Sequence, residues 1–146
     1  MAKTFKNFKE IENYIRTQVS ESLQDDVAKE VTQVMVEDGG TIDREVYQKY
    51  SPKSYQRTYE LKDPSTIEFK MIDDSTLSIG STRSDGNRYV AGVIESGKGY
   101  YTKALDEEIG ARPFHEKTAE ELERNKRHVE AMRKGLKKRL GSNAVI

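Results

Sequence analysis

The chain has 146 residues, of which 34% are hydrophobic and 34% are charged, and its 25 basic and 25 acidic residues cancel. This neutral balance argues against a global electrostatic field that would draw the chain to nucleic acid or to a membrane surface. The chain contains no cysteine, which excludes disulfides, thiolate metal sites and a cysteine nucleophile. Its length predicts one domain over residues 1–146. Its low hydrophobic content favours long amphipathic helices around a small sheet that neighbouring subunits can complete.

The N-terminal segment is predicted to form one long helix over residues 5 to 37, ended by Gly39 and Gly40. Its length allows a break near Gln24–Asp26. The opening residues, MAKTFKNFKEIENY, lack the apolar run of a signal peptide, and no segment approaches a membrane span. We therefore expect a soluble protein made in the cytoplasm. The apolar stripe of the helix recurs at steps of three and four and comprises Phe8, Ile11, Ile15, Val19, Leu23, Val27, Val31 and Val34.

A stretch rich in tyrosine, VYQKYSPKSYQRTYEL, follows at residues 46–61. Thr41 is expected to cap a short helix that runs through Tyr50, and Ser51 with Pro52 to open a single further helical turn. Two interpretations of the tyrosines stay open. The rings can pack in a small hydrophobic core while their hydroxyls stay in contact with water. Alternatively, they can form a protein–protein interface, where Tyr and Arg are enriched. The tyrosines in question are Tyr47, Tyr50, Tyr55 and Tyr59.

The hydrophobic period changes to two from Ile67 onward, which predicts strands. The first carries Ile67, Phe69 and Met71 on one face, the second contains Leu77 and Ile79, and Asp73-Asp74 forms the hairpin turn. The segment YVAGVIE, residues 89–95, is predicted to be a third, more buried strand. Residues 96–111 contain three glycines and no stable period, which predicts a mobile loop.

The last helix is expected to open at Pro113 and to run to about Leu140, followed by a frayed tail at residues 141–146. Acidic residues fill its first half and basic residues its second half, which suits the helix dipole. We interpret the basic half as a solvated or subunit-facing surface, with contact to phosphates as the alternative. Its stripe is Phe114, Thr118, Leu122, Asn125, Val129, Met132, Leu136 and Leu140.

Candidate catalytic groups are sparse. His115 and His128 lie thirteen residues apart on one predicted helix, which separates them by about 20 Å, so they cannot share a metal ion. We interpret each as a solvated or partly packed histidine. No nucleophile stands beside a base in the pattern of a known motif. We expect no enzymatic activity, no metal and no cofactor.

Three elements in order resemble a family of minor structural proteins of long-tailed bacteriophages, the head–tail connector or neck and tail-completion proteins, often labelled minor capsid or tail component. The tyrosine-rich stretch is similar to that family's Y-x-x-Y-x-P-x-x-Y-x-R-T-x-x-L element. YVAGVIESGKG is similar to its strand ending in a Glu-x-Gly turn, and ARPF to the opening of its final helix. The resemblance covers about residues 41 to 140. The matching residues are Tyr47, Tyr50, Pro52, Tyr55, Arg57, Glu95, Gly97, Arg112, Pro113 and Phe114.

The resemblance implies an α+β fold with a long N-terminal helix, a small, mainly antiparallel sheet of three to four strands and a long C-terminal helix. It implies a non-enzymatic virion protein that forms a ring at the head–tail junction, with copies of itself and other neck, portal-side or tail proteins as partners and with passing DNA as a non-specific contact. The sequence departs from the family pattern at His115, where an aliphatic residue is usual, and in a longer 98–110 loop. The alternative is a small nucleic-acid-binding or regulatory protein that uses the basic C-terminal helix.

Specific roles follow for the matching residues. Arg112 would sit just outside the last helix, free to reach a carboxylate, and Glu95 is one candidate partner. A bridge within one subunit and a bridge between subunits both stay open. Phe114 is expected to anchor the last helix on the sheet, and Arg57 to hydrogen-bond loop carbonyls beneath the tyrosines.

Overall fold

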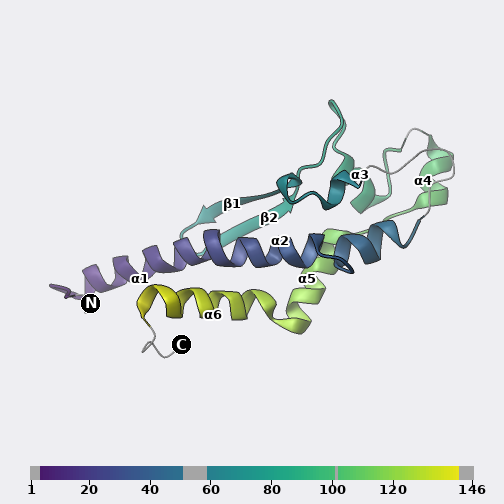
Figure 1. Ribbon diagram of the computed structural model, residues 1–146. Coiled ribbons are helices and arrows are strands. Elements are labelled where there is room, and N and C mark those ends of the chain that lie inside the picture. Colours follow the sequence, from purple (N-terminus) through teal and green to yellow (C-terminus); the bar gives the residue numbers. More distant parts are fainter. Residues whose placement is uncertain (1–3, 51–58, 101, 142–146) are drawn as a thin grey trace. The chain divides into compact units, whose positions relative to one another are not determined.

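The computed structural model describes residues 4–50, 59–100 and 102–141, and these form a mostly helical α+β structure with one small sheet (Figure 1). The chain divides into two compact units. Unit 1 comprises Met1–Glu30, Phe69–Ser78 and Arg127–Ile146, and unit 2 comprises Val31–Glu68 and Ile79–Lys126. Within the described ranges, no helix is long and apolar enough to cross a membrane. The expectation of one domain over residues 1–146 stays a prediction.

The elements follow one another in a fixed order along the chain. The longer helices are α1 (Phe8–Ser22), α2 (Ala28–Val36), α5 (Phe114–Asn125) and α6 (Arg127–Leu140), and the shorter ones are α3 (Val90–Ser96) and α4 (Lys103–Ile109). The strands are β1 (Ile67–Asp73) and β2 (Thr76–Ser81). Two π-helices, η1 (Leu23–Val27) and η2 (Asp43–Tyr47), and two 3₁₀ turns, η3 (Glu60–Lys62) and η4 (Pro64–Thr66), complete the order.

The predicted N-terminal helix is present, and α1, η1 and α2 follow one another without a gap in the sequence. Asn7 begins α1, because its side-chain oxygen accepts a hydrogen bond from the Glu10 N–H at 3.0 Å. The expected break near Gln24–Asp26 takes the form of the π-helix η1, in which the wider turn keeps the backbone hydrogen-bonded. The start of the apolar stripe is not covered, since Phe8 is 90% exposed.

Unit 1 is built on the packing of α6 against α1 and η1. Gly135 is buried at this contact, where an added Cβ would lie 2.0 Å from Oδ2 of Asp26 and 2.6 Å from Oγ of Ser22. The side chains of Asp26 and Ser22 thus occupy the space that a side chain at position 135 would need. Arg139, one turn further on, pairs with Asp25 at 2.8 Å and with Glu21 at 3.1 Å.

The helix predicted from Pro113 to about Leu140 is present, but it is broken at Lys126 into α5 and α6. Lys126 adopts a left-handed backbone conformation, with a φ of 57°, and its N–H closes α5 on the Leu122 carbonyl. This break changes the register of the second half, because a left-handed residue ends the i to i−4 hydrogen bonding. Val129, which was assigned to the buried stripe, is therefore 42% exposed, and Gly135 takes the buried position.

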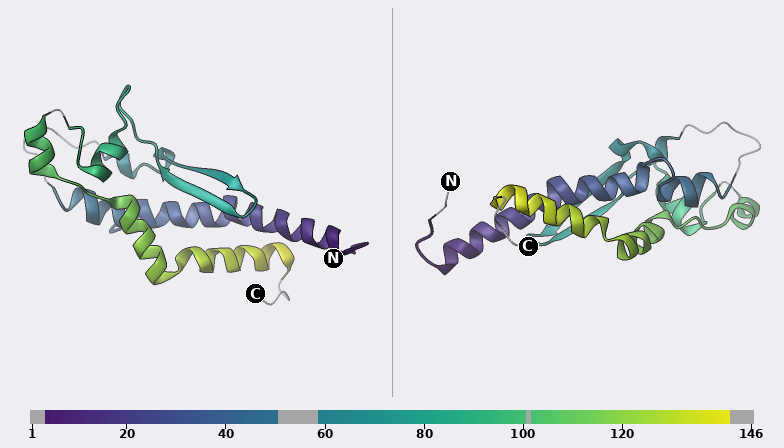
Figure 2. Two further views of the ribbon diagram at one scale, coloured as in Figure 1. Left: turned by 180° about the vertical axis from the view of Figure 1, so that it is seen from behind. Right: turned by 60° about the horizontal axis from the view of Figure 1, so that its bottom comes forward.

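The predicted hairpin is confirmed. Strands β1 and β2 lie side by side as the whole of the sheet in the described part of the chain (Figure 2). Asp73 shapes the turn, since its Oδ1 accepts a hydrogen bond from the Ser75 N–H at 2.9 Å. This backbone hydrogen bond lowers the pKa of Asp73 below its ordinary value. The expected count of three to four strands is wrong, because the sheet has two.

The predicted third strand is the helix α3. Its short apolar run fits either period, and in the helix Ala91 and Ile94 point inward three residues apart. The predicted loop over 96–111 also contains a helix, α4. It begins at Thr102, whose hydroxyl accepts a hydrogen bond from the Leu105 N–H at 3.2 Å, and it ends at Gly110. A threonine cap of this kind is a start signal that the three glycines obscured.

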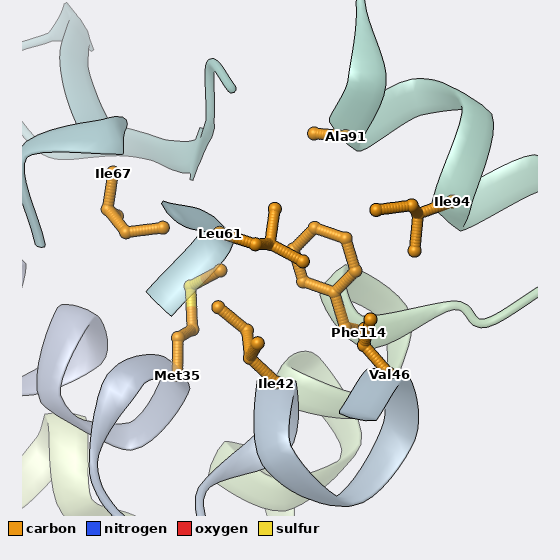
Figure 3. Packing of buried hydrophobic residues seen from close by; sticks show 8 residues of the cluster. All are labelled: Met35, Ile42, Val46, Leu61, Ile67, Ala91, Ile94 and Phe114. Atoms are coloured by element: carbon orange, nitrogen blue, oxygen red, sulfur yellow. The ribbon is translucent and has the colours of Figure 1, made fainter. Parts of the chain in front are cut away.

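The core of unit 2 surrounds Phe114, which is fully buried (Figure 3). Phe114 is the first residue of α5 and packs in the core, but most of its partners come from helices and turns. The expectation that it anchors this helix on the sheet stays a prediction. Thr41 was expected to cap a short helix through Tyr50, but it is itself helical and buried. Its buried hydroxyl lies 2.6 Å from the hydroxyl of Thr118 on α5. The core residues are Met35, Ile42, Val46, Leu61, Ile67, Ala91, Ile94 and Phe114.

Candidate functional site

Arg112 is the centre of the candidate site, which lies within unit 2 and which we call the motif cluster: Tyr47, Tyr50, Glu95, Gly97, Arg112, Pro113 and Phe114. Arg112 is 7% exposed. Its guanidinium donates hydrogen bonds to the Val46 carbonyl at 3.4 Å and to the Tyr100 hydroxyl at 2.8 Å, and lies 5.5 Å from the centre of the Tyr50 ring. A charged donor at the Val46 carbonyl suits the end of the helix η2, where the dipole favours a cation.

Glu95 contacts the opposite kind of helix end. Its two carboxylate oxygens accept hydrogen bonds from the N–H groups of His115 and Glu116, at 2.9 and 3.2 Å, at the start of α5. A carboxylate here satisfies two backbone donors that have no partner inside the helix. Arg112 and Glu95 therefore do not pair within this chain, because each residue contacts a different helix end. A bridge between subunits stays a prediction.

His115, the departure from the family pattern, links two elements of the cluster. Its Nδ1 lies 3.1 Å from Oε2 of Glu95, and its Nε2 accepts a hydrogen bond from the Ser81 N–H at 2.9 Å. The ring therefore connects α5 to α3 and to the end of β2. The interpretation of His115 as a partly packed histidine agrees with a side chain that is 27% exposed.

Gly97 occupies a position that other residues cannot take. Its φ is +73°, and an added Cβ would meet the Ala111 nitrogen at 2.3 Å and the Gly110 carbonyl carbon at 2.4 Å. The end of α3 therefore passes directly over the backbone that leads into Arg112, whose N–H donates to the Ile94 carbonyl at 2.8 Å. In this chain Glu95 caps α5, and Gly97 allows the backbone of residues 110 and 111 to approach the end of α3.

The tyrosine-rich stretch is described in part. Pro52, Tyr55 and Arg57 lie outside the described residues. The Tyr47 ring packs against the core and meets the ring of Tyr59 edge-on, with 4.8 Å between centroids. Tyr59 is 55% exposed and has a φ of 58°. Tyr47 thus fits the core interpretation of the tyrosines, whereas Tyr59 offers an accessible ring.

An ion pair connects the residues that flank this stretch on either side. The Lys62 ammonium lies 2.9 Å from Oδ2 of Asp43 and 3.0 Å from Oδ1 of Asp38. Burial by itself would raise the pKa of Asp43, but hydrogen bonds from Lys62 and from the Gly39 N–H lower it overall. Hydrogen bonds to Asp43 and Asp38 raise the pKa of Lys62. The pair joins η2 to η3 and so sets where Tyr47 and Tyr59 meet.

Sequence reasoning brought out most of the motif cluster but missed two of its contacts. Tyr100, which accepts a hydrogen bond from Arg112, lies in the predicted 96–111 loop, and no sequence pattern singled out Ser81, whose N–H donates to His115. Both partners lie far along the chain from the motif residues that they contact, so no local pattern points to them. The charged side chains of the cluster, Arg112 and Glu95, bind backbone groups at the ends of η2 and α5. These contacts fix the positions of the two helices.

The basic half of the C-terminal helix contacts acidic residues of its own unit. Arg127 donates to Glu30 at 2.8 Å, Arg133 to Glu130 at 2.6 Å, and Arg139 to the acidic residues of α1 and η1. These arginines are committed to intramolecular pairs, which reduces the positive charge that the helix presents. His128 lies on this helix in unit 1, whereas His115 belongs to unit 2.

Comparison with known proteins adds a family. A family model described as YomN matches residues 7–138. The chain is 34% identical over 141 residues to the SPbeta prophage-derived uncharacterized protein YomN of Bacillus subtilis (strain 168), a match that covers 94% of this chain and 95% of that protein. No solved structure matches.

Proposed function

Since the chain belongs to the YomN family, we propose that it is a non-enzymatic structural protein of a phage virion. It assembles as a ring in the neck and helps to join the DNA-filled head to the tail. Its partners are further copies of itself and the neck, portal-side or tail proteins on either side. It resides at the head–tail junction of the virion, and in the host cytoplasm during assembly. The prophage origin of the relative supports the phage context.

The observation that carries this proposal is the meeting of the three sequence elements in one cluster. Tyr50 comes from the tyrosine-rich stretch, Glu95 from the Glu-x-Gly turn and Arg112 from the opening of the last helix. The Tyr50 ring lies next to Arg112, and Arg112 and Glu95 contact the ends of η2 and α5. Residues that lie far apart in the sequence but together position neighbouring helices are what a subunit with fixed contact surfaces requires. A ring subunit meets its two neighbours through unlike surfaces, so the elements that carry those surfaces must hold a fixed geometry.

The nucleic-acid alternative has less support. It depends on the basic half of the last helix, and there Arg127, Arg133 and Arg139 contact carboxylates. A gel shift with duplex DNA across a salt titration separates the two functions. Specific binding that survives physiological salt would favour the alternative, whereas a virion protein needs no such affinity.

The first experiment locates the chain. In a phage whose genome encodes it, purified virions are analysed by quantitative mass spectrometry, and lysates of a phage with the gene deleted are examined by electron microscopy. We expect a low copy number per virion in the range of a single ring, and an accumulation of filled heads and free tails in the deletion. Absence of the chain from purified virions refutes the proposal.

The second experiment tests the tyrosine-rich stretch with a matched pair of variants. Tyr59→Ala removes a ring that is 55% exposed, and Tyr89→Ala removes one that is 51% exposed but lies outside the stretch. Both variants are first shown to fold by circular dichroism. Tyr59→Ala should reduce the yield of complete virions severalfold, because each interface in the ring of subunits would lack the tyrosine side chain. Tyr89→Ala should leave the yield unchanged. Equal yields would remove Tyr59 from the interface.

A further inference from the structure

The outer edge of strand β1 is open. The sheet contains β1 and β2 alone in the described part of the chain, so each strand has one edge without a strand neighbour. The corresponding edge of β2 is occupied near its end, because the Ser81 N–H donates to His115 and the Ser81 carbonyl accepts from the Tyr89 hydroxyl at 2.7 Å. No comparable contact with described residues covers β1. An isolated two-stranded hairpin is marginally stable, and an open edge is a template for a further strand.

The two ends of the hairpin do not share one register. The Thr82 N–H donates to the Thr66 carbonyl at 2.7 Å, just beyond the two strands, which places Ile67 opposite Ser81. The two-residue turn places Asp73 opposite Thr76, so β1 carries one residue more than β2 between these pairs. The open edge is therefore characterised by the side chains of β1.

The side chains along this edge are self-complementary. If two copies of β1 pair antiparallel with Phe69 opposite Phe69, then Glu68 of each copy lies opposite Lys70 of the other. Ile67 then lies opposite Met71 on the other face. The two charged pairs then lie directly opposite each other, at Cα distances of about 4.5–5.5 Å. Glu68, Phe69 and Lys70 are exposed, and Phe69 is 48% accessible.

Other registers lose this complementarity. A shift by two residues places Lys70 opposite Lys70 or Glu68 opposite Glu68, and a parallel in-register pairing aligns both like charges. Like charges directly opposite each other are destabilising. Strand β2 has no charged side chain, so pairing β1 of one copy with β2 of another creates neither charged pair. Charges on an edge strand can also prevent association, but here their alternating signs attract a second copy in one register.

We propose that the open edge of β1 binds the same edge of a second copy of this chain, antiparallel and centred on Phe69, to form a two-fold dimer with a continuous four-stranded sheet. This contact is independent of the proposed ring function, because a two-fold contact closes on itself and adds no third subunit. One pair of strands buries much less than the about 1,600 Å² of a standard interface, so the dimer forms at high protein concentration.

Disulfide cross-linking tests the register, and a chain without cysteine is a clean background. Directly opposite residues of an antiparallel pair lie about 4.5–5.5 Å apart between Cα atoms, which is within disulfide range. A mixture of Glu68→Cys and Lys70→Cys chains should therefore oxidise to a mixed dimer, identified by mass. Either variant alone should not, because identical positions lie about 8 Å apart. Absence of the mixed dimer, or cross-linking between Lys70→Cys and Ser78→Cys chains instead, overturns the proposal.

Charge reversal tests the same contact without cysteine. Lys70→Glu places like charges opposite each other and should weaken the dimer about tenfold in sedimentation equilibrium, whereas Glu68→Lys/Lys70→Glu should restore it. Lys98→Glu changes the net charge equally at an exposed site away from the strand and should have no effect. A wild-type chain that stays monomeric at millimolar concentration overturns the proposal, as does a double variant that stays as weak as the single one.

Discussion

Gly135→Ala is the substitution for which helix propensity and packing make opposite predictions. Gly135 lies inside α6, where replacing glycine by alanine is worth about 1 kcal/mol of helix stability. The structure places the new Cβ 2.0 Å from Oδ2 of Asp26 and 2.6 Å from Oγ of Ser22, distances at which one of these groups must move. Overpacking of this kind costs about 1–3 kcal/mol.

The neighbours of Gly135 are not free to move without loss. Oδ2 of Asp26 accepts the Ser22 hydroxyl at 3.0 Å and lies 3.5 Å from Arg139, and Ser22 is fully buried. Moving Asp26 gives up a hydrogen bond worth about 1 kcal/mol, which cancels the gain in helix propensity. The net expectation is that Gly135→Ala lowers the free energy of unfolding by about 1–3 kcal/mol.

Urea unfolding followed by circular dichroism measures this change, and a second background provides the control. Ser22→Ala/Asp26→Ala removes the atoms that the new methyl group would strike. In that background Gly135→Ala should stabilise the chain by about 1 kcal/mol, because helix propensity alone remains. A substitution that stabilises the wild-type chain, or that has the same effect in both backgrounds, would refute the assigned contact between α6 and η1.

Three further predictions concern unit 2. Phe114→Ala should lower the free energy of unfolding by about 3–5 kcal/mol, because it leaves a cavity at a fully buried ring; a shift of only a degree or two in a thermal melt would mean that the ring is not core. Glu95→Ala should cost about 1–3 kcal/mol in urea unfolding, because it leaves the first N–H groups of α5 without their acceptor, and Glu95→Gln should cost less. The Asp43–Lys62 pair should stabilise the fold over a defined pH window. The folded-state pKa of Asp43 is below 3.8 and that of Lys62 is above 10.5. The stability difference between wild type and Asp43→Asn should therefore be constant at intermediate pH, shrink as the pH falls below 3.8, and shrink again above 10.5. A difference that persists at pH 2 would show that the lost interaction is not ionic.

The local signals of the sequence predicted several elements correctly. The three- and four-residue steps of the first 37 residues indicated α1 and α2, Asp73 and Asp74 indicated the hairpin turn, and Phe114 was assigned to the core. Each of these depends on residues close together in the chain, where periodicity, a turn former or a first helical position acts directly. The errors at α3 and α4 are also local, since a short apolar run fits both periods and a glycine-rich stretch can hide a threonine cap.

Tertiary structure alone decided which groups become partners. Nothing near Glu95 in the sequence indicates that it caps α5, twenty residues further on, instead of pairing with Arg112. The same holds for Gly135. A glycine inside a helix is expected to lower its stability, and only the folded chain shows that Asp26 occupies the space a larger residue would need. A charged side chain has several candidate partners of similar energy, and the packing of the core around Phe114 selects among them by bringing one within hydrogen-bond distance. Periodicity determines which face of an element is buried, but only the folded chain determines what that face meets.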